Sequence, residues 1–411
     1  MRSDIREYKQ VVVRRKRMEL ASKDSCTGCG NCGLVCKKKA VTFTRDALNN
    51  IYPVIDSSKC VECGLCQKVC PAINQAEKNS PKVCYSCYAT NEAIRKSSAS
   101  GGVAQAIYRW CLKNDIPFAG VYFDNKELTA KYKLGFSEED IHQFVNSKYT
   151  FSFMGSISED VIDILKNGKS LVFIGLPCQV AAVKKYAEIK KVNTENLFTV
   201  DIICHGVPSD LYIKEHVKNI CNGGAEIDRL SFRDERFMTS KFVFSVDYNG
   251  KNYHKYVESN DNFQIGYHNA TIYRPNCYSC MYAGPNRCGD LTIGDFTGLG
   301  RVASVDGNIA EMKYQGVSCV LCNSEKGQKF LAQIGNEKYL SIDSRPIEEA
   351  LKFENQLASP SIPSAYRNRF IELYPEKGFD KACNVVFKKE KLKRPIIHAA
   401  KMCVKKVLGR R

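Results

Sequence analysis

The sequence lacks an apolar run long enough to cross a membrane. A membrane-spanning helix needs roughly 18 consecutive apolar residues, and the longest candidate, residues 171–183, is interrupted by Gly175, Pro177 and Gln179. The first 20 residues lack the apolar core of a secretory signal, because charged side chains occur throughout them. We therefore expect a cytoplasmic protein.

The body of the chain also lacks the positive charge that nucleic-acid binding requires. The net charge is +17, but residues 388–411 hold ten Lys and Arg against one Glu, and residues 1–20 hold seven basic against three acidic side chains. This leaves a charge of +4 for all the residues between them. Because a nucleic-acid-binding domain presents a basic face with interleaved aromatic side chains, we expect no nucleic-acid partner.

The basic tail, residues 388–411, allows two interpretations. It is either a solvated charged segment or an amphipathic helix, because apolar residues recur in it at helical spacing. These apolar residues are Ile396, Ile397, Ala400, Val404 and Leu408. Since Lys401, Lys405 and Lys406 fall largely off the apolar stripe, such a helix would lie on an anionic membrane surface or on an acidic partner.

Cysteine, by contrast, is abundant, and the chain has 21 of them. Clustered cysteines in a long intracellular chain are typical of metal sites rather than of disulfides. Eight of them form two runs with the spacing Cys-x2-Cys-x2-Cys-x3-Cys, the second starting 34 residues after the first. The first run is Cys26, Cys29, Cys32 and Cys36, and the second is Cys60, Cys63, Cys66 and Cys70.

This spacing predicts a bacterial-type ferredoxin module with two [4Fe–4S] clusters. Three thiolates separated by two residues surround one face of a cubane, and in two-cluster modules the fourth cysteine of each run binds the other cluster. Zinc sites use Cys-x2-Cys pairs without this triple spacing. We therefore expect one cluster on Cys26, Cys29, Cys32 and Cys70, and a second on Cys60, Cys63, Cys66 and Cys36.

The length of the chain indicates more than one hydrophobic core. After a basic leader at residues 1–22, the cysteine-rich segment predicts a ferredoxin domain at residues 23–78. Strands and helices then alternate, which is typical of an α/β body. We assign the two parts of this body to residues 82–160 and 161–345, and we expect a helical region with the basic tail at residues 346–411.

The clearest elements of the body are six strands and three helices. The strands are expected at residues 120–123, 171–174, 199–203, 242–247, 291–293 and 317–321. The helices are expected at residues 102–113, 158–166 and 179–189. We expect the second helix to begin at the N-cap Ser158, because Glu159 and Asp160 follow it.

Four further cysteines are candidates for a third cluster. Cys178 and Cys204 each follow an apolar strand, and Cys277 and Cys280 form a Cys-x2-Cys pair in a loop. Open α/β sheets place their sites at the carboxyl ends of strands, so these four thiolates can meet. From the residues alone, a reactive thiol at Cys178, at the start of a helix, is the alternative.

The remaining cysteines of the body are expected to be buried structural thiols, since free cysteine is a common core residue. Two Cys-x2-Cys pairs are included because side chains three apart on a strand do not share a face. The set comprises Cys84, Cys87, Cys319, Cys322, Cys111, Cys221, Cys383 and Cys403.

Two loops have the composition of a ligand site. Residues 97–103, Ser-Ser-Ala-Ser-Gly-Gly-Val, run directly into an expected helix. Free backbone N–H groups at a helix N-terminus bind phosphate or pyrophosphate, although a simple helix cap is the alternative. The strand at residues 291–293 is followed by Gly-Asp-Phe-Thr-Gly-Leu-Gly. In this second loop Asp295 can contact a ribose or a ring nitrogen, or cap a turn.

Six segments together resemble the family of the beta subunit of coenzyme F-420-reducing hydrogenase and its dehydrogenase relatives. The first three are Ser98-Ala-Ser-Gly-Gly-Val, Asn146-Ser-Lys-Tyr and Gly175-Leu-Pro-Cys-Gln. The others are Asp201-Ile-Ile-Cys-His-Gly-Val-Pro-Ser, Ser231-Phe-Arg-Asp and Gly289-Asp-Leu-Thr-Ile-Gly-Asp-Phe. The resemblance covers roughly residues 80–330, and an N-terminal ferredoxin module is a common addition in the family.

The resemblance implies an α/β (or α+β) flavoprotein body that binds FAD and has its own [4Fe–4S] cluster near the flavin. The ligands that it implies are Cys178, Cys204, Cys277 and Cys280, with Cys288 as a nearby thiol that can replace one of them. Expected FAD contacts are Ser98, Ser100, Gly101, Gly102 and Lys148, to which Asp295 is added from the second loop. Lys148 and Arg233 are the cations expected at the flavin or substrate, where positive charge stabilises the anionic reduced ring.

The implied function is that of an oxidoreductase. It would pass electrons between the ferredoxin-type module and FAD, and exchange hydride there with coenzyme F-420 or another organic substrate. Flavin is the necessary converter, because clusters carry one electron and organic substrates take two. The expected partners are a redox protein or ferredoxin and a small hydride donor or acceptor. The alternative is a non-enzymatic electron-transfer component of a larger redox complex, which predicts clusters but no flavin.

Overall fold

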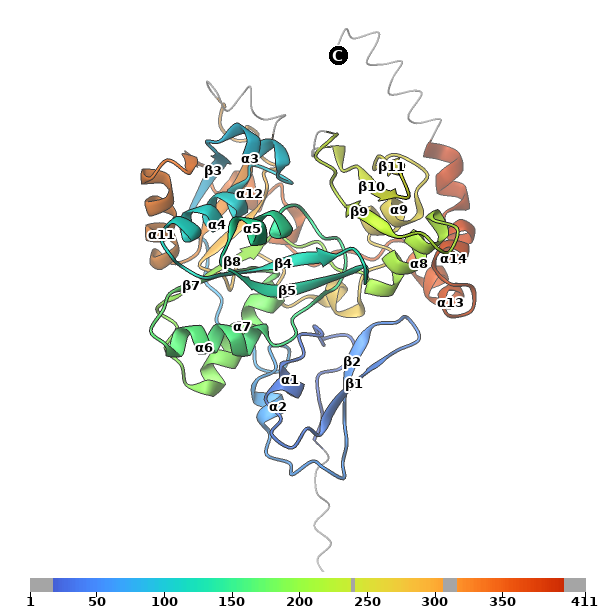
Figure 1. Cartoon of the computed structure of the whole chain (residues 1–411), viewed down its shortest axis with the longest axis horizontal. Helices are drawn as coiled ribbons and strands as arrows, with labels where there is room; N and C mark the ends of the chain where they lie inside the picture. Colours follow the sequence, from blue (N-terminus) through green and yellow to red (C-terminus); the bar gives the residue numbers. More distant parts are fainter. Residues whose placement is uncertain (1–17, 238–240, 306–315, 395–411) are drawn as a thin grey trace, which may run out of the picture.

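The computed structural model describes residues 18–237, 241–305 and 316–394. They form three parts (Figure 1): a main lobe around a nine-stranded sheet, a smaller lobe around a three-stranded sheet, and the N-terminal module. The tail helix expected around residues 396–408 and the thiol of Cys403 lie outside the described residues.

The main sheet is mixed, with the strand order β14-β3-β13-β12-β8-β7-β4-β5-β6. Its central strands are parallel to one another: β12 (Leu291–Asp295), β8 (Leu197–Ile202), β7 (Leu171–Gly175) and β4 (Phe118–Asp124). The outer strands are β13 (Ser318–Cys322), β3 (Val83–Ala89) and β14 (Leu340–Arg345) on one side, and β5 (Thr129–Gly135) and β6 (Ser152–Phe153) on the other. Residues 82–160 and residues 161–345 therefore build one sheet together.

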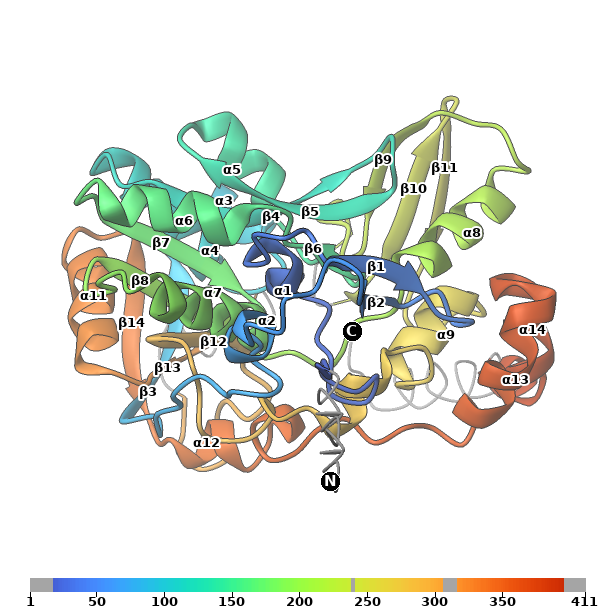
Figure 2. The same cartoon turned by 90° about the horizontal axis from the view of Figure 1, so that it is seen from below.

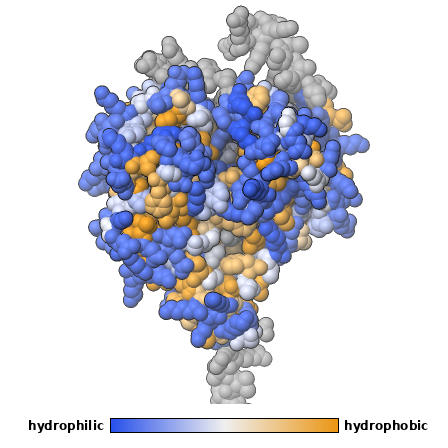
Figure 3. All heavy atoms as spheres, viewed as in Figure 1, coloured by the Kyte–Doolittle hydropathy of each residue, from blue (hydrophilic) through white to orange (hydrophobic). Residues whose placement is uncertain are grey.

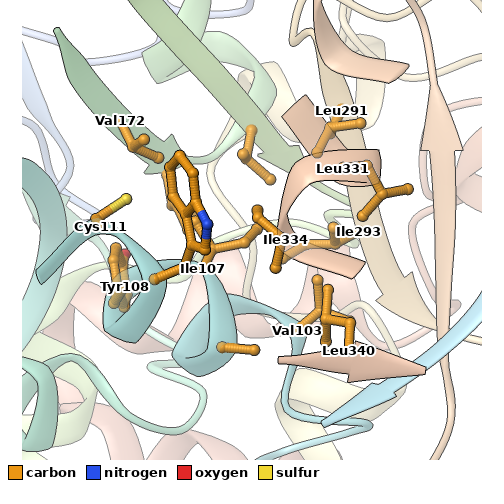
Figure 4. Packing of buried hydrophobic residues seen from close by; sticks show 14 of the residues in the cluster. Val103, Ile107, Tyr108, Cys111, Val172, Leu291, Ile293, Leu331, Ile334 and Leu340 are labelled. Carbon is orange, nitrogen blue, oxygen red and sulfur yellow. The ribbon is translucent and has the colours of Figure 1, made fainter. Parts of the chain in front are cut away.

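Helices cover both faces of the main sheet. On one face lie α4 (Val103–Lys113), α5 (Glu138–Phe144) and α11 (Glu325–Asn336), and on the other lie α6 (Ile157–Lys166) and α7 (Pro177–Lys190). Figure 4 shows the first of these cores, where Ile107 of α4 and Ile334 of α11 pack with Leu291 of β12. Because both faces are covered, β7 is an uninterrupted run of buried residues, as is typical of parallel strands.

Shorter helices connect these elements and complete the two lobes. They are α3 (Glu92–Ser97), α12 (Glu348–Leu351) and the 3-10 helix η3 (Asn355–Leu357). Of the thiols expected to be structural, Cys84, Cys87, Cys111, Cys319, Cys322 and Cys383 are buried, while Cys221 is only partly buried. The two Cys-x2-Cys pairs lie in the main sheet, and its two faces divide them as the strand alternation predicts. Cys84 and Cys319 lie in one core, while Cys87 and Cys322 lie in the core of the opposite face.

The smaller lobe draws on two distant parts of the chain. Its antiparallel sheet consists of β9 (Ile227–Ser231), β10 (Phe244–Tyr248) and β11 (Lys251–Lys255). Its helices are α8 (Asp210–Ile220), α9 (Asn262–His268), α13 (Arg367–Lys377) and α14 (Phe379–Val386). Buried His216 of α8 connects the N-terminus of α9 with α14. Its Nε2 lies 2.9 Å from Asp261 Oδ2, and its Nδ1 lies 2.8 Å from Asp380 Oδ1.

The N-terminal module consists of a hairpin and two single-turn helices. Its elements are α1 (Asn31–Leu34), β1 (Val41–Arg45), β2 (Ile51–Ile55) and α2 (Leu65–Lys68). Buried Asn31 donates to the carbonyl of Ala182 at 2.8 Å, and Arg45 forms a bidentate pair with Asp210 at 2.9 and 3.0 Å. The module is thereby fixed to α7 of the main lobe and to α8 of the smaller lobe (Figure 2).

Figure 3 shows how polar and apolar groups are distributed on one face. Hydrophilic side chains cover most of both lobes in this view, and apolar groups gather lower down, where the module joins the body. Within the ranges that the structure describes, no helix is both long and apolar enough to cross a membrane.

The observed architecture confirms a mixed α/β body with a central mixed sheet behind an N-terminal module. All six expected strands and all three expected helices are present, with ends within two residues of those expected. The predicted start of α6 is wrong. This helix begins at Ile157 after Ser156, and Ser158 does not cap it but donates from a buried position to Asn31 Oδ1 at 3.0 Å. The reason is a contact with the module, which local sequence does not reveal.

Candidate functional site

The carboxyl ends of three parallel strands, β7, β8 and β12, lie at one edge of the main sheet. Directly after β7, Pro177 starts α7 and Cys178 follows in its first turn. Proline suits the first helical position because its fixed φ is helical and its missing N–H is not needed there. Cys204 follows the end of β8 in the same way. The edge therefore brings together residues that are distant in sequence.

Four cysteines line one small cavity at this edge. We call Cys178, Cys204, Cys277 and Cys280 the body group. The last two come from the 3-10 helix η2 (Pro275–Ser279) and the residue that follows it. Burial raises the pKa of Cys178 and repulsion from the three other thiols raises it further, and burial also raises the pKa of Cys277 to about 11. Four converging thiols that deprotonate when a metal centre binds fit an iron–sulfur cluster.

Cys288 lies outside the body group. Its thiol donates to the carbonyl of Pro177 at 3.0 Å and lies 3.7 Å from Asp201 Oδ2. Asp201 in turn is fully buried and forms an ion pair of 2.7 Å with Arg287. Cys288 is thus part of a polar network behind the cavity, and the geometry favours the body group without it.

The cysteines of the module fall into two groups. In the inner group, burial and repulsion from Cys70 raise the pKa of Cys29 to about 12, so the last cysteine of the second run lies beside the first run. In the outer group, burial raises the pKa of Cys66, and Cys60 and Cys63 add repulsion. The inner group is Cys26, Cys29, Cys32 and Cys70. The outer group is Cys60, Cys63 and Cys66, to which the ferredoxin spacing adds Cys36.

The inner group faces the body group across the interface between module and body. Thr27, between two cysteines of the inner group, lines the small cavity of the body group. The charge on Cys29 also contributes to the raised pKa of Cys178. Cys63 of the outer group, by contrast, is exposed. The three groups therefore form a series from the surface of the module to the interior of the body.

A cavity of about 890 Å³ opens between the main lobe and the smaller lobe. Clefts that hold cofactors or drug-sized ligands measure about 300–1,000 Å³. Its walls include aromatic side chains, among them Tyr149, whose ring stacks on Tyr267 with centroids 4.4 Å apart. Of the residues expected to contact a cofactor or substrate, Gly101 does not line this cavity. The six that do are Ser98, Ser100, Gly102, Lys148, Arg233 and Asp295.

The Ser/Gly loop brings the N-terminus of α4 to the large cavity. Gly102 caps this helix with a φ of +85°, a conformation that favours glycine. Gly101 has no room for a side chain, because a Cβ would lie 2.5 Å from the carbonyl oxygen of Cys87. Ser98 fixes the loop by accepting a hydrogen bond from Gln105 at 2.7 Å. The first turn of α4, whose backbone N–H groups have no partner within the helix, lines the cavity.

Lys148 holds the C-terminus of α5 at the wall of the large cavity. Its ammonium donates to four consecutive carbonyls, those of residues 143–146, at distances of 2.7–3.3 Å. Cations at a helix C-terminus interact favourably with such carbonyls. Burial nevertheless lowers the pKa of Lys148 to about 7, so its charge changes near neutral pH.

Arg233 and Asp295 form an ion pair in the large cavity. Arg233 Nη1 lies 2.8 Å from Asp295 Oδ2, and the ring centroid of Phe242 lies 4.1 Å from the guanidinium carbon. Arg233 follows β9 of the smaller lobe, while Asp295 ends β12 of the main sheet. The pair joins the two lobes and leaves the carboxylate half-exposed in the cavity.

The far end of the glycine-rich loop after β12 is held by a carboxylate of the main lobe. The N–H groups of Gly300, Val302 and Ala303 donate to Glu349 Oε1 at 3.1–3.2 Å. Glu349 is fully buried and also pairs with Arg345 at 2.7 Å. The far end of the loop therefore binds a carboxylate of the protein itself, while Gly294, Asp295 and Thr297 at its start line the large cavity.

The large cavity and the small cavity of the body group share a wall. Leu176, Gln179, Cys204 and His205 line both. Gln179 is held in place because its Oε1 accepts from the Tyr132 hydroxyl at 2.7 Å and from the Leu176 N–H at 3.1 Å. Sequence reasoning assigned no role to Gln179 or His205, although each directly follows an expected cysteine ligand.

The donor chemistry of the cysteine groups distinguishes between metals. Across residues 18–237, 241–305 and 316–394, no group of three or more His, Cys, Asp or Glu side chains can hold a single metal ion. Sets of four sulfur donors suit zinc or an iron–sulfur cluster, and the triple spacing of the two runs in the module favours iron–sulfur clusters there.

Two segments of the chain match known families. Residues 168–347 match the family described as the C terminus of the beta subunit of coenzyme F420 hydrogenase/dehydrogenase. They contain β7 to β14 and the whole body group. Residues 25–74 match the 4Fe-4S dicluster domain and contain the inner and outer groups. This domain implies two [4Fe–4S] clusters in the module.

One curated protein and one solved structure extend the comparison. The chain is similar to the F subunit of F(420)H(2) dehydrogenase from Methanosarcina mazei, with 24% identity over 220 residues, 49% of this chain and 61% of that protein. It thus spans about three fifths of the length of this relative. A chain of the F420-reducing [NiFe] hydrogenase complex from Methanosarcina barkeri is similar with a TM-score of 0.43 and 18% identity, over 75% of this chain and 92% of that one.

The first match covers β7, β8 and β12 and the edge at which the body group lies, and the second covers the eight cysteines of the module. Residues 168–347 therefore belong to the family of the C-terminal part of the coenzyme F420 hydrogenase/dehydrogenase beta subunit, and residues 25–74 form an N-terminal 4Fe-4S dicluster domain.

Proposed function

We propose that the chain is an iron–sulfur flavoprotein oxidoreductase that passes electrons between its module and FAD bound in the large cavity. The observation that carries this proposal is the wall shared by the two cavities, with Cys204 and Gln179 lining both. A flavin on one side of this wall and a cluster on the other would be neighbours. The inner group continues the series on the far side of the body group.

The residues of the large cavity suit the parts of FAD. The N-terminus of α4 offers free backbone N–H groups for a pyrophosphate. Aromatic walls such as the stacked pair Tyr149 and Tyr267 suit flat rings. Lys148 and Arg233 supply positive charge. FAD, when bound, exchanges two electrons with an organic substrate as hydride and single electrons with clusters.

The substrate that we propose is coenzyme F420 or another organic hydride donor or acceptor. The support is the family of residues 168–347, whose description names the coenzyme. The cavity contributes a volume of about 890 Å³, an entrance between two lobes and two cations at its wall. An anionic substrate would be attracted by these cations, and Asp295 would orient Arg233 towards it.

The partner that we propose is an acidic redox protein, such as a ferredoxin, that docks at the outer group. Three exposed lysines, Lys37, Lys38 and Lys39, directly follow Cys36, and Lys59 and Lys68 flank other cysteines of the same module. Val61, directly after Cys60, is an exposed apolar residue of the same module. Complementary charge guides such encounters and sets their orientation.

Anaerobic purification followed by quantitation of iron, acid-labile sulfide and flavin tests the proposal. We expect about 12 iron atoms per chain, since each of three cubanes holds four, together with bound FAD. The loaded protein should then reduce or oxidise a deazaflavin or another hydride acceptor. Iron for two cubanes and no flavin after reconstitution would instead leave a non-enzymatic component for electron transfer.

A further inference from the structure

Arg274 bonds to a cysteine of the body group and to a cysteine of the inner group. Its backbone carbonyl accepts from the N–H of Cys277 at 3.0 Å. Its guanidinium Nη2 donates to the carbonyl of Cys26 at 3.4 Å and to the carbonyl of Ile51 at 3.1 Å. One side chain of the body therefore reaches across the interface into the first cysteine loop of the module.

The guanidinium of Arg274 is enclosed by the protein. Arg274 is 1% exposed, and its charge lies between the rings of Tyr52 and Phe151, with centroids 5.1 and 5.0 Å away. Its Nε donates to Asn276 Oδ1 at 3.3 Å. Among the described residues, no Asp or Glu forms an ion pair with it. The hydrogen-bond partners that the structure gives it are neutral.

Another buried arginine of the body, Arg287, differs from Arg274 in having an anionic partner. Arg287 is equally buried, but Asp201 neutralises it at 2.7 Å. Burying a charge without an opposite charge is strongly unfavourable. We therefore expect a negatively charged group other than Asp or Glu to lie near Arg274 in the loaded protein. Clusters with four thiolate ligands are anionic, and each gains one more negative charge when it is reduced.

We propose that Arg274 is a cation shared by the inner cluster and the body cluster, and that its charge raises the reduction potentials of both. A positive charge near two anionic centres stabilises their reduced, more negative forms. Arg274 acts on the clusters through space and positions the two ligand loops; it is not a ligand itself. The proposal rests on the clusters of the proposed function but not on the flavin.

A purely mechanical role is the alternative, since Arg274 also holds module and body together. Arg45 provides the matched control, because its bidentate pair with Asp210 fastens the same interface away from the cysteines. Loss of Arg45 should loosen the interface without changing the charge beside a cluster. The reduction potential separates the two roles.

The experiment is an anaerobic potentiometric titration of the loaded full chain, followed by EPR and visible absorption. Arg274→Gln is expected to shift the reduction potentials of the inner cluster and the body cluster to more negative values. The reduction potential of the outer cluster, which is identified by its change in Cys63→Ser, should stay unchanged. A tenfold change in the ratio of oxidised to reduced cluster corresponds to about 59 mV for one electron, and we expect a shift of this order. Arg274→Lys, which keeps the charge, and Arg45→Gln should stay close to the wild type.

The possible results distinguish a failure of the proposed charge effect of Arg274 from a failure of the proposed cluster assignment. Unshifted potentials in Arg274→Gln with full iron content, or equal shifts in Arg274→Lys and Arg274→Gln, overturn the role of the charge. Iron for two cubanes in the wild type would instead overturn the cluster assignment. If Arg274→Gln does not retain iron, Asn276→Asp places a carboxylate beside the intact guanidinium. In Asn276→Asp the reduction potentials of the inner and body clusters should then become more negative. Unchanged potentials in this variant overturn the proposal.

Discussion

The guanidinium of Arg233 lies 2.8 Å from the carboxylate of Asp295, so a cation of the smaller lobe and an anion of the main sheet meet inside the large cavity. Each was expected to contact a cofactor or substrate, but they are 62 residues apart in the chain and nothing in the sequence pairs them. Asp295 holds Arg233 in place, and its half-exposed carboxylate limits the positive charge that the cavity offers.

Replacing Arg233 should weaken flavin binding. We expect Arg233→Met to lower the affinity for FAD about tenfold, equal to about 1.4 kcal/mol, because a charged hydrogen bond contributes about 1.5–3 kcal/mol. Quenching of flavin fluorescence on titration into the deflavinated protein measures this. Arg229→Met is the matched control, since Arg229 lies on β9 and pairs with Glu235 instead. An unchanged affinity in Arg233→Met would remove Arg233 from the flavin site.

The charge of Lys148 should make flavin binding depend on pH. Burial lowers the pKa of Lys148 to about 7, so its ammonium form is lost as the pH rises through neutrality. We expect the affinity for FAD to fall between about pH 6 and pH 9, because the ligand carries phosphates. Lys148→Arg should bind with little dependence on pH in this range, since arginine remains protonated. A flat wild-type profile would mean that the four carbonyls keep the lysine charged.

The same group has a linked effect on stability with a defined sign. The pKa of Lys148 is lower in the folded chain than the ordinary value of 10.5. Between about pH 7 and 10.5 the unfolded chain therefore holds a proton that the folded chain has lost, and the free energy of unfolding rises with pH. Denaturation of the wild type and of Lys148→Met across this range should differ in slope accordingly.

Part of this site could be predicted from sequence because the relevant signals are local. The spacing of Cys26 to Cys36 identifies cluster ligands within one short segment of the chain, and apolar runs predict strands such as β7. The cysteines after β7 and β8 could be grouped because parallel strands end at a common edge. The structure brings Cys178 and Cys204 to one cavity at that edge.

Other features depend on which segments meet in space, and the sequence does not encode this locally. His268 lines the large cavity from α9 of the smaller lobe, and burial lowers its pKa to about 4, yet no motif surrounds it. The glycine-rich loop after β12 was expected to meet a ligand, and its start does line the large cavity, but at its far end the N–H of Gly300 donates to Glu349, which lies about fifty residues later. Arg274 was likewise unmarked, since several of its neighbours, Cys26, Ile51 and Tyr52, come from the distant module.

The buried cluster of His216, Asp261 and Asp380 should stabilise the smaller lobe in a pH-dependent way. Burial opposes the charge on His216, but both carboxylates raise its pKa to about 10, above the ordinary 6.5. Its contribution is complete below about pH 6.5 and is lost as the pH rises through 10. The pKa of Asp261 is lowered to about 2 despite its burial, because His216 is close by, so its contribution is present above about pH 4 and is lost as the pH falls through 2.

His216→Gln should therefore destabilise the protein strongly, by about 3–5 kcal/mol, because it leaves buried carboxylates without a cation. The difference in thermal midpoint from the wild type should be largest near about pH 6 and should shrink as the pH rises. The exposed His142 of α5 offers the control His142→Gln, which should match the wild type at every pH. A destabilisation of His216→Gln that does not change with pH would show that the imidazole is not charged.

Electron entry should depend on the lysines next to the outer group. Reversing the charge of Lys37, Lys38 and Lys39 should slow reduction by an acidic ferredoxin about tenfold or more at low salt, since complementary charge raises association rates. The effect should fade at high ionic strength. The triple Lys→Glu variant at Lys126, Lys329 and Lys338, exposed residues of the main lobe, is the charge-matched control. Stopped-flow reduction at several salt concentrations measures the rates, and equal rates in both variants would place the docking surface elsewhere.

The ligands of the proposed third cluster can be distinguished by counting iron. Cys204→Ser should lower the iron content from about 12 to about 8 atoms per chain, because one cubane of three is lost. Cys288→Ser should keep all of it, since the Cys288 thiol donates to the carbonyl of Pro177 rather than lining the small cavity. Both cysteines lie in the same family-matched segment, so general instability would affect the two variants alike. Loss of iron in Cys288→Ser with retention in Cys204→Ser would reassign the ligand. The cluster would then be held by Cys288, which lines neither cavity, in place of Cys204, which lines both.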